Sequence, residues 1–597
     1  MGTYLIAVGN NSDLEMISRN YEQLPFFNRE EVKIFSLSIQ TSVLIMAKTV
    51  SDISDENQTT HFFNGWMTNH EDSSMCLGQE GFNQLQEKFK MEQLHLKEGA
   101  FVHATWEGVN FSLRHDCFGL YPILYLQMAN VFVASDSMVV LTNLKKMMGY
   151  TNKICKRVNA TRSWTHGLSS AIMSTDTIVK GIRYLPPASS INVVIKEGKK
   201  ESVGFKIDVP KYKTIFSKNS QPYFQQIRDS CQQILRMTST LQSVPGIDLK
   251  LGLSGGLDSR VVFAALQSND RTLKRVNIRS NEHSSRSLDY AIVDSMADRF
   301  QFDFNLKDNT KEIQERTGCK PVAITERYGN WALSNLGLFD MTYMYSSYWN
   351  HPAVIEVGGH GAEIVKGTFS KTSLFRIGFR KKPIKFLQLR KEIKHALSAI
   401  GVPYANKGAM GWHYLAYKCA LQNASSRGRS LMIARPLLNR KLCSMGLNHS
   451  SESKNTILED ILILLSPELA AFRFDKVEKN IHPAYIKKLI ATFAEFEPLE
   501  SSPYKIFGTL KSIKNGTLDS FQTLANQFAE HDSNSKKFIL MEMEGIWSEL
   551  RSENLKKEYQ TAYQLALERL SDDGSYSASA GTPASKIISL SLAEDVF

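Results

Sequence analysis

Residues 249–266, LKLGLSGGLDSRVVFAAL, change character twice along their length. A short apolar run breaks at the small and polar residues SGGLDS, 254–259, and the apolar residues that follow have a spacing typical of a helix. The pattern predicts a strand, a tight turn and a helix. Gly255 and Gly256 would let the turn adopt backbone conformations that other residues avoid, and would let a ligand approach the backbone closely.

The predicted turn has the composition of an anion-binding site. Backbone N–H groups at the start of a helix point outward unpaired and attract an anion, and the serines add hydroxyl donors. Asp258 would repel a bound polyphosphate unless a divalent cation lay between them, and Mg²⁺ prefers such oxygen ligands. We therefore expect a pyrophosphate and magnesium site, with Asp258 as metal ligand and these phosphate-binding residues: Ser254, Gly255, Gly256, Asp258 and Ser259.

Other interpretations of the same turn stay open. GLSGG also fits the nucleophile-elbow pattern G-x-S-x-G with Ser254 as the attacking group, although that pattern leaves Asp258 and Ser259 without a task. A P-loop would end in Gly-Lys-Ser/Thr, and this turn has no lysine. The glycines could also serve packing alone.

The bulk composition limits the classes of protein to consider. At 597 residues the chain exceeds what one hydrophobic core usually supports, so at least two domains are expected. The formal charge is +11, but the lysines and arginines are spread along the chain without a basic stripe interleaved with aromatic residues. Nucleic-acid binding is therefore not predicted, whereas a basic protein suits phosphate-bearing substrates.

Cysteine usage and the apolar runs bear on location. The seven cysteines lie far apart and none has the close spacing of a zinc or redox motif, which favours reduced thiols. The first residues lack the charged start and apolar core of a signal peptide. No apolar run is long enough to span a bilayer. We expect a cytoplasmic protein without a membrane partner.

The pattern of elements divides the chain in two. Residues 1–205 read as short, mostly alternating segments, including a hairpin at WEGVN, and predict a β-rich domain. Residues 215–570 alternate helices and strands before becoming largely helical, which predicts an α/β domain with a doubly wound parallel sheet. Residues 571–597 are small and polar, and are expected to form a flexible tail.

Several segments together resemble a known family. SGGLDS is similar to the signature of the ATP-pyrophosphatase enzymes, and its setting resembles the asparagine synthetase family. Residues 98–136 resemble the N-terminal sheet of that family, VIEVGGHGAEIVKG at 354–367 its second pyrophosphate and magnesium loop, and RPLLNRKL at 435–442 a later segment. The resemblance implies an N-terminal α+β sandwich of the glutaminase type and a C-terminal ATP-pyrophosphatase domain with a helical C-terminal part.

The resemblance implies a reaction that uses ATP and Mg²⁺. Members of the family adenylate a carboxylate, release pyrophosphate, and let an amine displace AMP to form an amide. In the second loop, Gly359 and Gly361 would bind phosphate. The family pattern there is G-E-G-S-D-E, against GHGAEI here, so Glu363 falls on the metal-binding aspartate and His360 on the preceding glutamate.

Three further residues receive roles from this comparison. His360 could be the base that deprotonates the attacking amine, or could only hydrogen-bond phosphate or backbone. Lys476, in FRFDKVEKN, is expected to stabilise charge developing on the adenylate and the leaving phosphate; Lys479 is the alternative, and Arg473 lies nearby in the sequence. Asp289 would lie near the nucleotide or act as a first-turn acid of a helix. No role is assigned to Arg260.

The N-terminal part departs from glutamine-hydrolysing members of the family. Those need a cysteine directly after the initiator methionine, where thiol and free amine act together. Here Gly2 and Thr3 occupy that region, and the first cysteine is Cys76, although Asn64 and Gly65 resemble the oxyanion donors of the family. We expect a degenerate glutaminase-like domain without glutaminase activity.

Members of the family that lack the cysteine resemble β-lactam synthetase, carbapenam synthetase and the lasso-peptide cyclases. The expected function is therefore an amide-forming ligase whose substrate, a small molecule or a peptide, carries both the carboxylate and the amine. A lasso-type cyclase would have a precursor peptide and its protease as partners. Two alternatives remain: asparagine synthetase-like amidation of an acid with free ammonia or an external glutaminase, and a catalytically inactive scaffold homologue.

Overall fold

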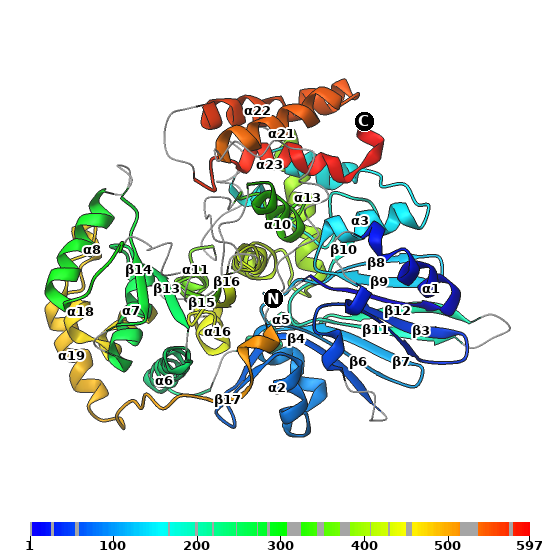
Figure 1. Cartoon of the computed structure of the whole chain (residues 1–597). Coiled ribbons are helices and arrows are strands. Elements are labelled where there is room, and N and C mark those ends of the chain that lie inside the picture. Colours follow the sequence, from blue (N-terminus) through cyan, green and yellow to red (C-terminus); the bar gives the residue numbers. More distant parts are fainter. Residues whose placement is uncertain are drawn as a thin grey trace.

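A computed structural model gives the structure of the chain, and the residues that it describes are 3–24, 29–53, 59–164, 167–196, 201–217, 220–245, 247–270, 273–282, 287–306, 324–342, 351–369, 383–405, 408–427, 430–448, 456–513, 535–571 and 577–597. The fold is of the α/β class (Figure 1). It contains a sandwich of two largely antiparallel sheets, a separate parallel sheet, and a layer of C-terminal helices.

The sandwich is built almost entirely from the first 208 residues. Its six-stranded sheet has the order β10 (Arg183–Tyr184), β8 (Leu124–Met128), β9 (Val131–Ser135), β1 (Leu5–Asn10), β3 (Thr41–Met46), β2 (Val32–Ser36). Its seven-stranded sheet has the order β12 (Ser202–Asp208), β11 (Ser190–Lys196), β7 (Asn110–His115), β6 (Glu98–Glu107), β4 (Thr60–Asn69), β5 (Ser74–Leu77), β17 (Lys505–Gly508).

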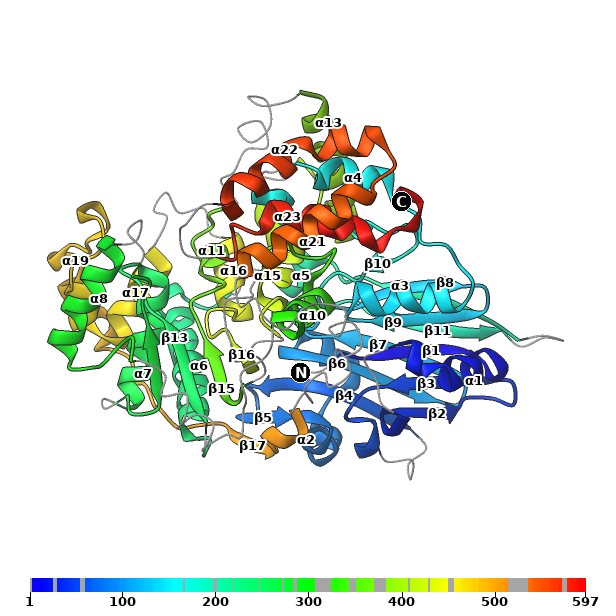
Figure 2. The same cartoon turned by 45° about the horizontal axis from the view of Figure 1, so that its top comes forward.

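Helices cover the outer faces of the sandwich. Helices α1 (Asn11–Arg19) and α3 (Met138–Met147) pack on the six-stranded sheet, and α2 (Gly78–Leu85) packs on the other (Figure 2). Strands β1 and β3 are buried on both faces for this reason, which is why each contains an unbroken apolar run, residues 5–8 in β1 and residues 43–46 in β3. The predicted WEGVN hairpin is confirmed: it joins β6 to β7, and Gly108 takes the left-handed conformation that its turn requires, with φ +51°.

One strand of the sandwich comes from far along the chain. Strand β17 lies parallel to β5, with Lys505 opposite Ser74 and Gly508 opposite Leu77. These four residues belong to the range that the sequence assigned to the second domain. A strand that joins the edge of a sheet is held mainly by main-chain hydrogen bonds, which any sequence can form. The four residues of β17 therefore do not indicate which sheet they join.

The predicted parallel sheet is present. Its four strands have the order β14 (Val276–Arg279), β13 (Asp248–Gly252), β15 (His351–Val357), β16 (Ser430–Ala434), and all neighbouring pairs are parallel. The chain moves outward from β13 to β14 and then crosses back to β15. The strand order therefore reverses between β13 and β15, and such a switch point is where open α/β sheets bind ligands, beyond the carboxyl ends of the strands.

Helices surround this sheet and link it to the sandwich. Helices α6 (Tyr223–Ser243), α7 (Leu257–Asn269) and α17 (Thr456–Leu465) pack against one another beside β13, and α11 (Ala362–Val365) packs on α16 (Arg440–Asn448). Other α-helices before residue 500 are α4 (Lys156–Arg162), α5 (Tyr212–Ile215), α8 (Ser287–Phe300), α10 (Ile324–Asn335), α13 (Pro383–Ala399), α14 (Ala409–His413), α15 (Ala420–Ala424), α18 (Pro467–Ala471) and α19 (Pro483–Phe493).

Three C-terminal helices, α21 (Ser535–Glu549), α22 (Glu553–Ser571) and α23 (Thr582–Ile588), pack together at one side of the molecule (Figure 1). They contact the N-terminal part of the chain. The Tyr559 hydroxyl donates to Asn159 Oδ1 at 2.7 Å, and Glu594 Oε2 accepts the backbone N–H of Asn152 at 2.9 Å. Among the residues that the structure places, no helix combines the length and apolar character that crossing a membrane requires.

The expectation of a flexible tail from residue 571 is wrong for residues 577–597. Lys586 is 1% exposed, and its ammonium donates to Asp340 Oδ2 at 2.9 Å, while Asp340 also pairs with Arg162. Small residues allow this close packing: a Cβ on Gly581 would lie 2.0 Å from Thr342 Oγ1. The small, polar composition that suggests mobility in the sequence here allows tight contact between segments.

Removing residues 577–597 is expected to unfold the chain or make it insoluble. Five large apolar side chains of this segment are buried, and each contributes about 1.5–3 kcal/mol by burial, a total near the whole stability of a domain; they are Ile587, Ile588, Leu590, Leu592 and Val596. Thermal unfolding and the soluble fraction after expression measure the effect, with Lys586→Met as a milder companion. An unchanged melting temperature in the truncated chain would contradict this packing.

Candidate functional site

The predicted strand, turn and helix around SGGLDS are confirmed. Strand β13 ends at Gly252, and α7 begins at Leu257 with Gly256 as its N-cap in an extended conformation. The next strand of the sheet, β15, ends at Val357, and a second glycine loop runs from there to α11. Because β13 and β15 are adjacent and parallel, both loops lie at the same edge of the sheet, at its switch point.

The two loops touch at Gly359. A Cβ at this position would lie 2.7 Å from the carbonyl carbon and oxygen of Asp258 and 2.9 Å from the Ser259 nitrogen. Gly361 has φ +101°, and a Cβ there would meet Leu438 at 2.7 Å. Both positions therefore require glycine. The structure brings these predicted site residues together from segments about a hundred positions apart.

Serine hydroxyls close the first loop on itself. Ser254 N–H donates to Ser259 Oγ at 3.1 Å, and Gly256 N–H donates to Ser254 Oγ at 3.3 Å. Gly255 N–H donates to Asp289 Oδ1 at 3.1 Å. Asp289 lies in the first turn of α8, as one of its two predicted roles requires, and its carboxylate also contacts the predicted phosphate loop.

The nucleophile-elbow alternative receives no support from these contacts. Ser254 Oγ lies 3.2 Å from Ser259 Oγ and accepts the Gly256 N–H. Within the described ranges, no histidine or carboxylate hydrogen-bonds this hydroxyl, as an activated serine would require.

The two carboxylate oxygens of Asp258 lie in different environments. Its Oδ2 accepts a hydrogen bond from Lys366 Nζ at 2.7 Å. Its Oδ1 is buried and has no hydrogen-bond partner among the described residues, although a third of the side chain is exposed. A buried carboxylate oxygen without a partner is costly. This oxygen is a hard ligand at the place where the sequence predicts magnesium, so the residues present fit the ion.

Asp258 contributes a single carboxylate to the turn. Among the described residues, no cluster of three or more His, Cys, Asp or Glu side chains could form an all-protein metal site. Magnesium bound with nucleotides typically uses one or two carboxylates together with phosphate oxygens and water. Asp258 supplies one such carboxylate.

Glu363 faces its own loop and a π-helical segment. Its Oε2 accepts the Gly361 N–H at 3.1 Å. Its charge acts on η8 (Tyr414–Cys419): burial lowers the pKa of Lys418, and the Glu363 carboxylate partly restores it. Burial, and to a smaller extent Glu363, raises the pKa of Tyr414. π-Helical turns are frequent at functional sites. The role of Glu363 as a metal ligand stays a prediction.

His360 and Arg435 flank the second loop. A Cβ on Gly358 would lie 3.3 Å from His360 Nδ1 and 3.2 Å from Arg435 Nη1. Arg435 is buried, pairs with Glu356 at 2.7 Å, and donates from Nε to Asn423 Oδ1 at 3.0 Å. It therefore holds the end of β15 in place. The role of His360 as a base stays a prediction.

Arg260 joins the first loop to a later segment. Its guanidinium donates to four backbone carbonyls and lies 3.8 Å from the ring centroid of Phe474. The acceptors are Gly255 at 3.3 Å, Leu469 at 3.3 Å, Phe472 at 2.8 Å and Arg473 at 2.9 Å. Arg260 is completely buried, so its role is to fix the glycine turn against residues 469–474.

This later segment brings Lys476 towards the turn. A Cβ on Gly255 would lie 3.1 Å from Asp475 Cβ, and Lys476 follows Asp475 in the chain. Lys479 Nζ is bound to both Asp475 oxygens at 2.8 Å. The Lys476 side chain is exposed, and the described residues provide no hydrogen bond or ion pair to its ammonium. Of the two lysines, Lys476 is therefore the one whose charge is available, and its catalytic role stays a prediction.

Sequence reasoning missed Lys366, Lys418 and Arg435. Lys418 carried a usable signal, because it is a single charge in the apolar run WHYLAYKCALQ. Arg435 is the first residue of the RPLLNRKL segment that resembles the family, but no feature of that segment indicates a role for the Arg435 side chain. Lys366 follows a short helix and meets Asp258 only because the two loops cross. No local pattern could have revealed that contact.

Cys76 and Cys117 of the N-terminal sandwich are buried thiols. Cys76 is 1% exposed, and burial raises its pKa well above the ordinary value. Asn64 is also buried, and its Nδ2 donates to the Tyr121 hydroxyl at 3.0 Å. Gly2, which stands where glutamine-hydrolysing members of the resembled family have their cysteine, lies outside the described residues. The one cysteine near Asn64 in the sequence is thus a buried thiol, which cannot act as a nucleophile.

We expect the purified chain to release no ammonia from glutamine. The thiolate is the nucleophilic form of cysteine, and burial keeps the Cys76 thiol protonated. A glutamate dehydrogenase-coupled assay with glutamine, with and without Mg²⁺ and ATP, measures this directly. Cys76→Ala serves as the matched variant. Ammonia release that disappears in this variant would contradict the assignment.

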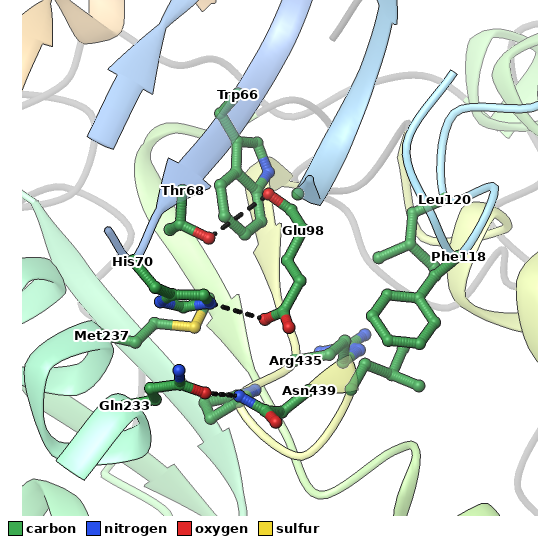
Figure 3. A pocket seen from close by; sticks show the side chains of 13 residues that line it. Trp66, Thr68, His70, Glu98, Phe118, Leu120, Gln233, Met237, Arg435 and Asn439 are labelled. Atoms are coloured by element: carbon green, nitrogen blue, oxygen red, sulfur yellow. Dashed lines mark hydrogen bonds and ion pairs between the residues drawn. The ribbon is translucent and has the colours of Figure 1, made fainter. Parts of the chain in front are cut away.

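A small cavity lies between the sandwich and the parallel-sheet part (Figure 3). Its volume is about 20 Å³, room for one water molecule, and Trp66, His70, Glu98 and Arg435 contribute to its walls. His70 Nε2 lies 3.0 Å from Glu98 Oε2 (Figure 3), and His70 Nδ1 lies 2.7 Å from the Tyr504 hydroxyl. Arg435 thus belongs both to this wall and to the second glycine loop. The cavity is too small for a nucleotide.

The comparisons with known proteins give weak likenesses. No family model matches the sequence, and no curated protein matches it. Two solved structures each cover 81% of this chain at 10% sequence identity and a TM-score of 0.21. One is described as the allosteric regulatory enzyme of purine biosynthesis, with 98% of that chain covered. The other is glutamine phosphoribosylpyrophosphate amidotransferase from B. subtilis in complex with ADP and GMP, with 100% covered. Likeness at this TM-score assigns no activity to this chain.

Proposed function

We propose that this chain is an ATP-dependent, amide-forming synthetase that adenylates a carboxylate and joins it to an amine. The observation that carries the proposal is the buried, unpartnered Oδ1 of Asp258, which lies where two glycine loops meet at the switch point of a parallel sheet. A carboxylate in an anion-binding turn is explained by a cation shared with the anion. A turn that served packing alone would not require a buried carboxylate oxygen without a hydrogen-bond partner.

The residues of the site have separate tasks in this proposal. Asp258, and Glu363 if its side chain turns, would hold Mg²⁺, which would neutralise the phosphates when bound. Ser254, Ser259 and the backbone N–H groups at the start of α7 would bind the pyrophosphate group, with Gly255 and Gly256 allowing its close approach. The positive charge of Lys476 would stabilise the charge that develops as a substrate carboxylate oxygen bonds to the α-phosphorus and the bond to pyrophosphate breaks.

Amide formation then needs a base. The amine nitrogen would attack the acyl carbon and AMP would leave with the bonding electrons, while the amine loses a proton. His360 stands on the second loop, beside Gly358, and its imidazole can take that proton near neutral pH. The buried Cys76 thiol supports an amine supplied by the substrate itself, because a thiol that burial keeps protonated does not generate ammonia from glutamine.

The products distinguish this proposal from its alternatives. The chain would be incubated with ATP, Mg²⁺ and candidate substrates that carry a carboxylate and an amine, and the products analysed by mass spectrometry. The proposal expects AMP, pyrophosphate and a substrate lighter by one water. Conversion of an acid to its primary amide would indicate ammonia as the amine. Formation of ADP and phosphate would contradict the proposal.

A further inference from the structure

Lys366 connects the two glycine loops through its side chain. It follows α11, and its backbone N–H donates to the Ala362 carbonyl at 2.8 Å, which fixes the turn that carries it. From there its ammonium crosses to the first loop and donates to Asp258 Oδ2 at 2.7 Å. The partners are 108 residues apart in sequence. The ion pair is partly screened, with 22% of the lysine and 33% of the aspartate side chain exposed.

The pair leaves the carboxylate able to serve a second cation. Lys366 uses Oδ2, whereas Oδ1 is buried and unpartnered among the described residues. A metal on Oδ1 and the ammonium on Oδ2 would be held by one carboxylate. Two such cations repel each other, and both attract an anion placed at the loop amides. Lys366 therefore has opposite electrostatic effects on the two ligands of the site.

We propose that Lys366 is a resident cation of this site, which offsets the charge of Asp258 and adds a positive charge for the pyrophosphate leaving group. The inference rests on the proposed function, because it takes Asp258 as the metal ligand. It assigns Lys366 a binding task that the sequence did not predict. The ion pair also explains how the Asp258 carboxylate is tolerated beside a polyphosphate. The Lys366 ammonium offsets the negative charge of Asp258 even when no metal is bound.

The test uses two probes with the full chain: Mn²⁺ alone, followed by electron paramagnetic resonance, and inorganic pyrophosphate in excess Mg²⁺, followed by calorimetry. Lys366→Met keeps the length of the side chain and removes its charge. We expect about tenfold weaker pyrophosphate binding and about threefold tighter Mn²⁺ binding, because one charge is lost beside both ligands. Lys366→Arg should keep both affinities within about twofold of the wild type.

Matched controls separate charge from folding. Lys391→Met removes an exposed lysine of α13 and should change neither affinity. If Lys366→Met weakens both ligands equally, or changes neither, Lys366 is only a structural residue and the inference is overturned while the proposed function stands. If the wild type binds neither pyrophosphate nor ATP in the presence of Mg²⁺, the proposed function fails, and this inference with it.

Discussion

Asp258→Asn is expected to weaken Mg²⁺-dependent binding of an ATP analogue by about 100-fold, equivalent to roughly 3 kcal/mol. Asparagine has almost the same shape, so the turn should keep its structure. It replaces a charged oxygen ligand with a neutral one, and hard divalent cations prefer carboxylates. It also leaves the Lys366 ammonium, now 2.7 Å from a carboxylate oxygen, without a charged partner.

Calorimetry with a non-hydrolysable ATP analogue, titrated at several Mg²⁺ concentrations, measures the effect. Asp298→Asn makes the same charge change on the exposed surface of α8 and should bind like the wild type. Thermal unfolding of all three proteins shows whether they remain folded. Equal affinity in Asp258→Asn, with the same dependence on Mg²⁺, would mean that the metal is held elsewhere.

Arg260→Met is expected to lower the stability of the parallel-sheet part by about 3–5 kcal/mol, because buried backbone carbonyls lose a charged hydrogen-bond donor. Methionine fills much of the space but donates no hydrogen bond. Four backbone carbonyls would then lose this donor, and of these Leu469 still accepts the Phe472 N–H. A buried acceptor left without any donor costs about 1–3 kcal/mol when no water replaces the donor. The stacking on Phe474 would also be lost.

The same variant should affect nucleotide binding, because one of the four carbonyls belongs to Gly255 in the turn. Chemical unfolding followed by fluorescence measures the stability, and calorimetry measures the binding. Arg473→Met is the matched control, since its side chain is exposed and bonded only to Ser295 Oγ among the described residues. A loss of stability in both variants alike would show that Arg260 has no special part in the turn.

Local patterns predicted the local structure well. The strand, turn and helix predicted at 249–266 agree with β13 and α7, and Asp289 lies in the first turn of a helix, α8, as one of its two predicted roles requires. In each case one periodicity covers the whole element, and the side chains that decide it are neighbours in the chain. The family resemblance added the second loop, which no periodicity marks.

Contacts between distant segments could not be predicted in this way. β17 joins a sheet through its backbone, α23 is buried through small residues, and Lys366 reaches Asp258 across two loops. None of these contacts changes the pattern of apolar residues along the chain. They depend on how the elements meet, which is decided by the whole fold.

The most direct test of the central claim is a crystal structure with Mn²⁺ and a non-hydrolysable ATP analogue, collected at the manganese absorption edge. We expect one anomalous peak within coordination distance of Asp258 Oδ1, with the analogue's β- and γ-phosphates between the turn at 254–259 and the loop at 358–361. Phosphates bound elsewhere, or bound at the turn with no manganese on Asp258, would contradict the account.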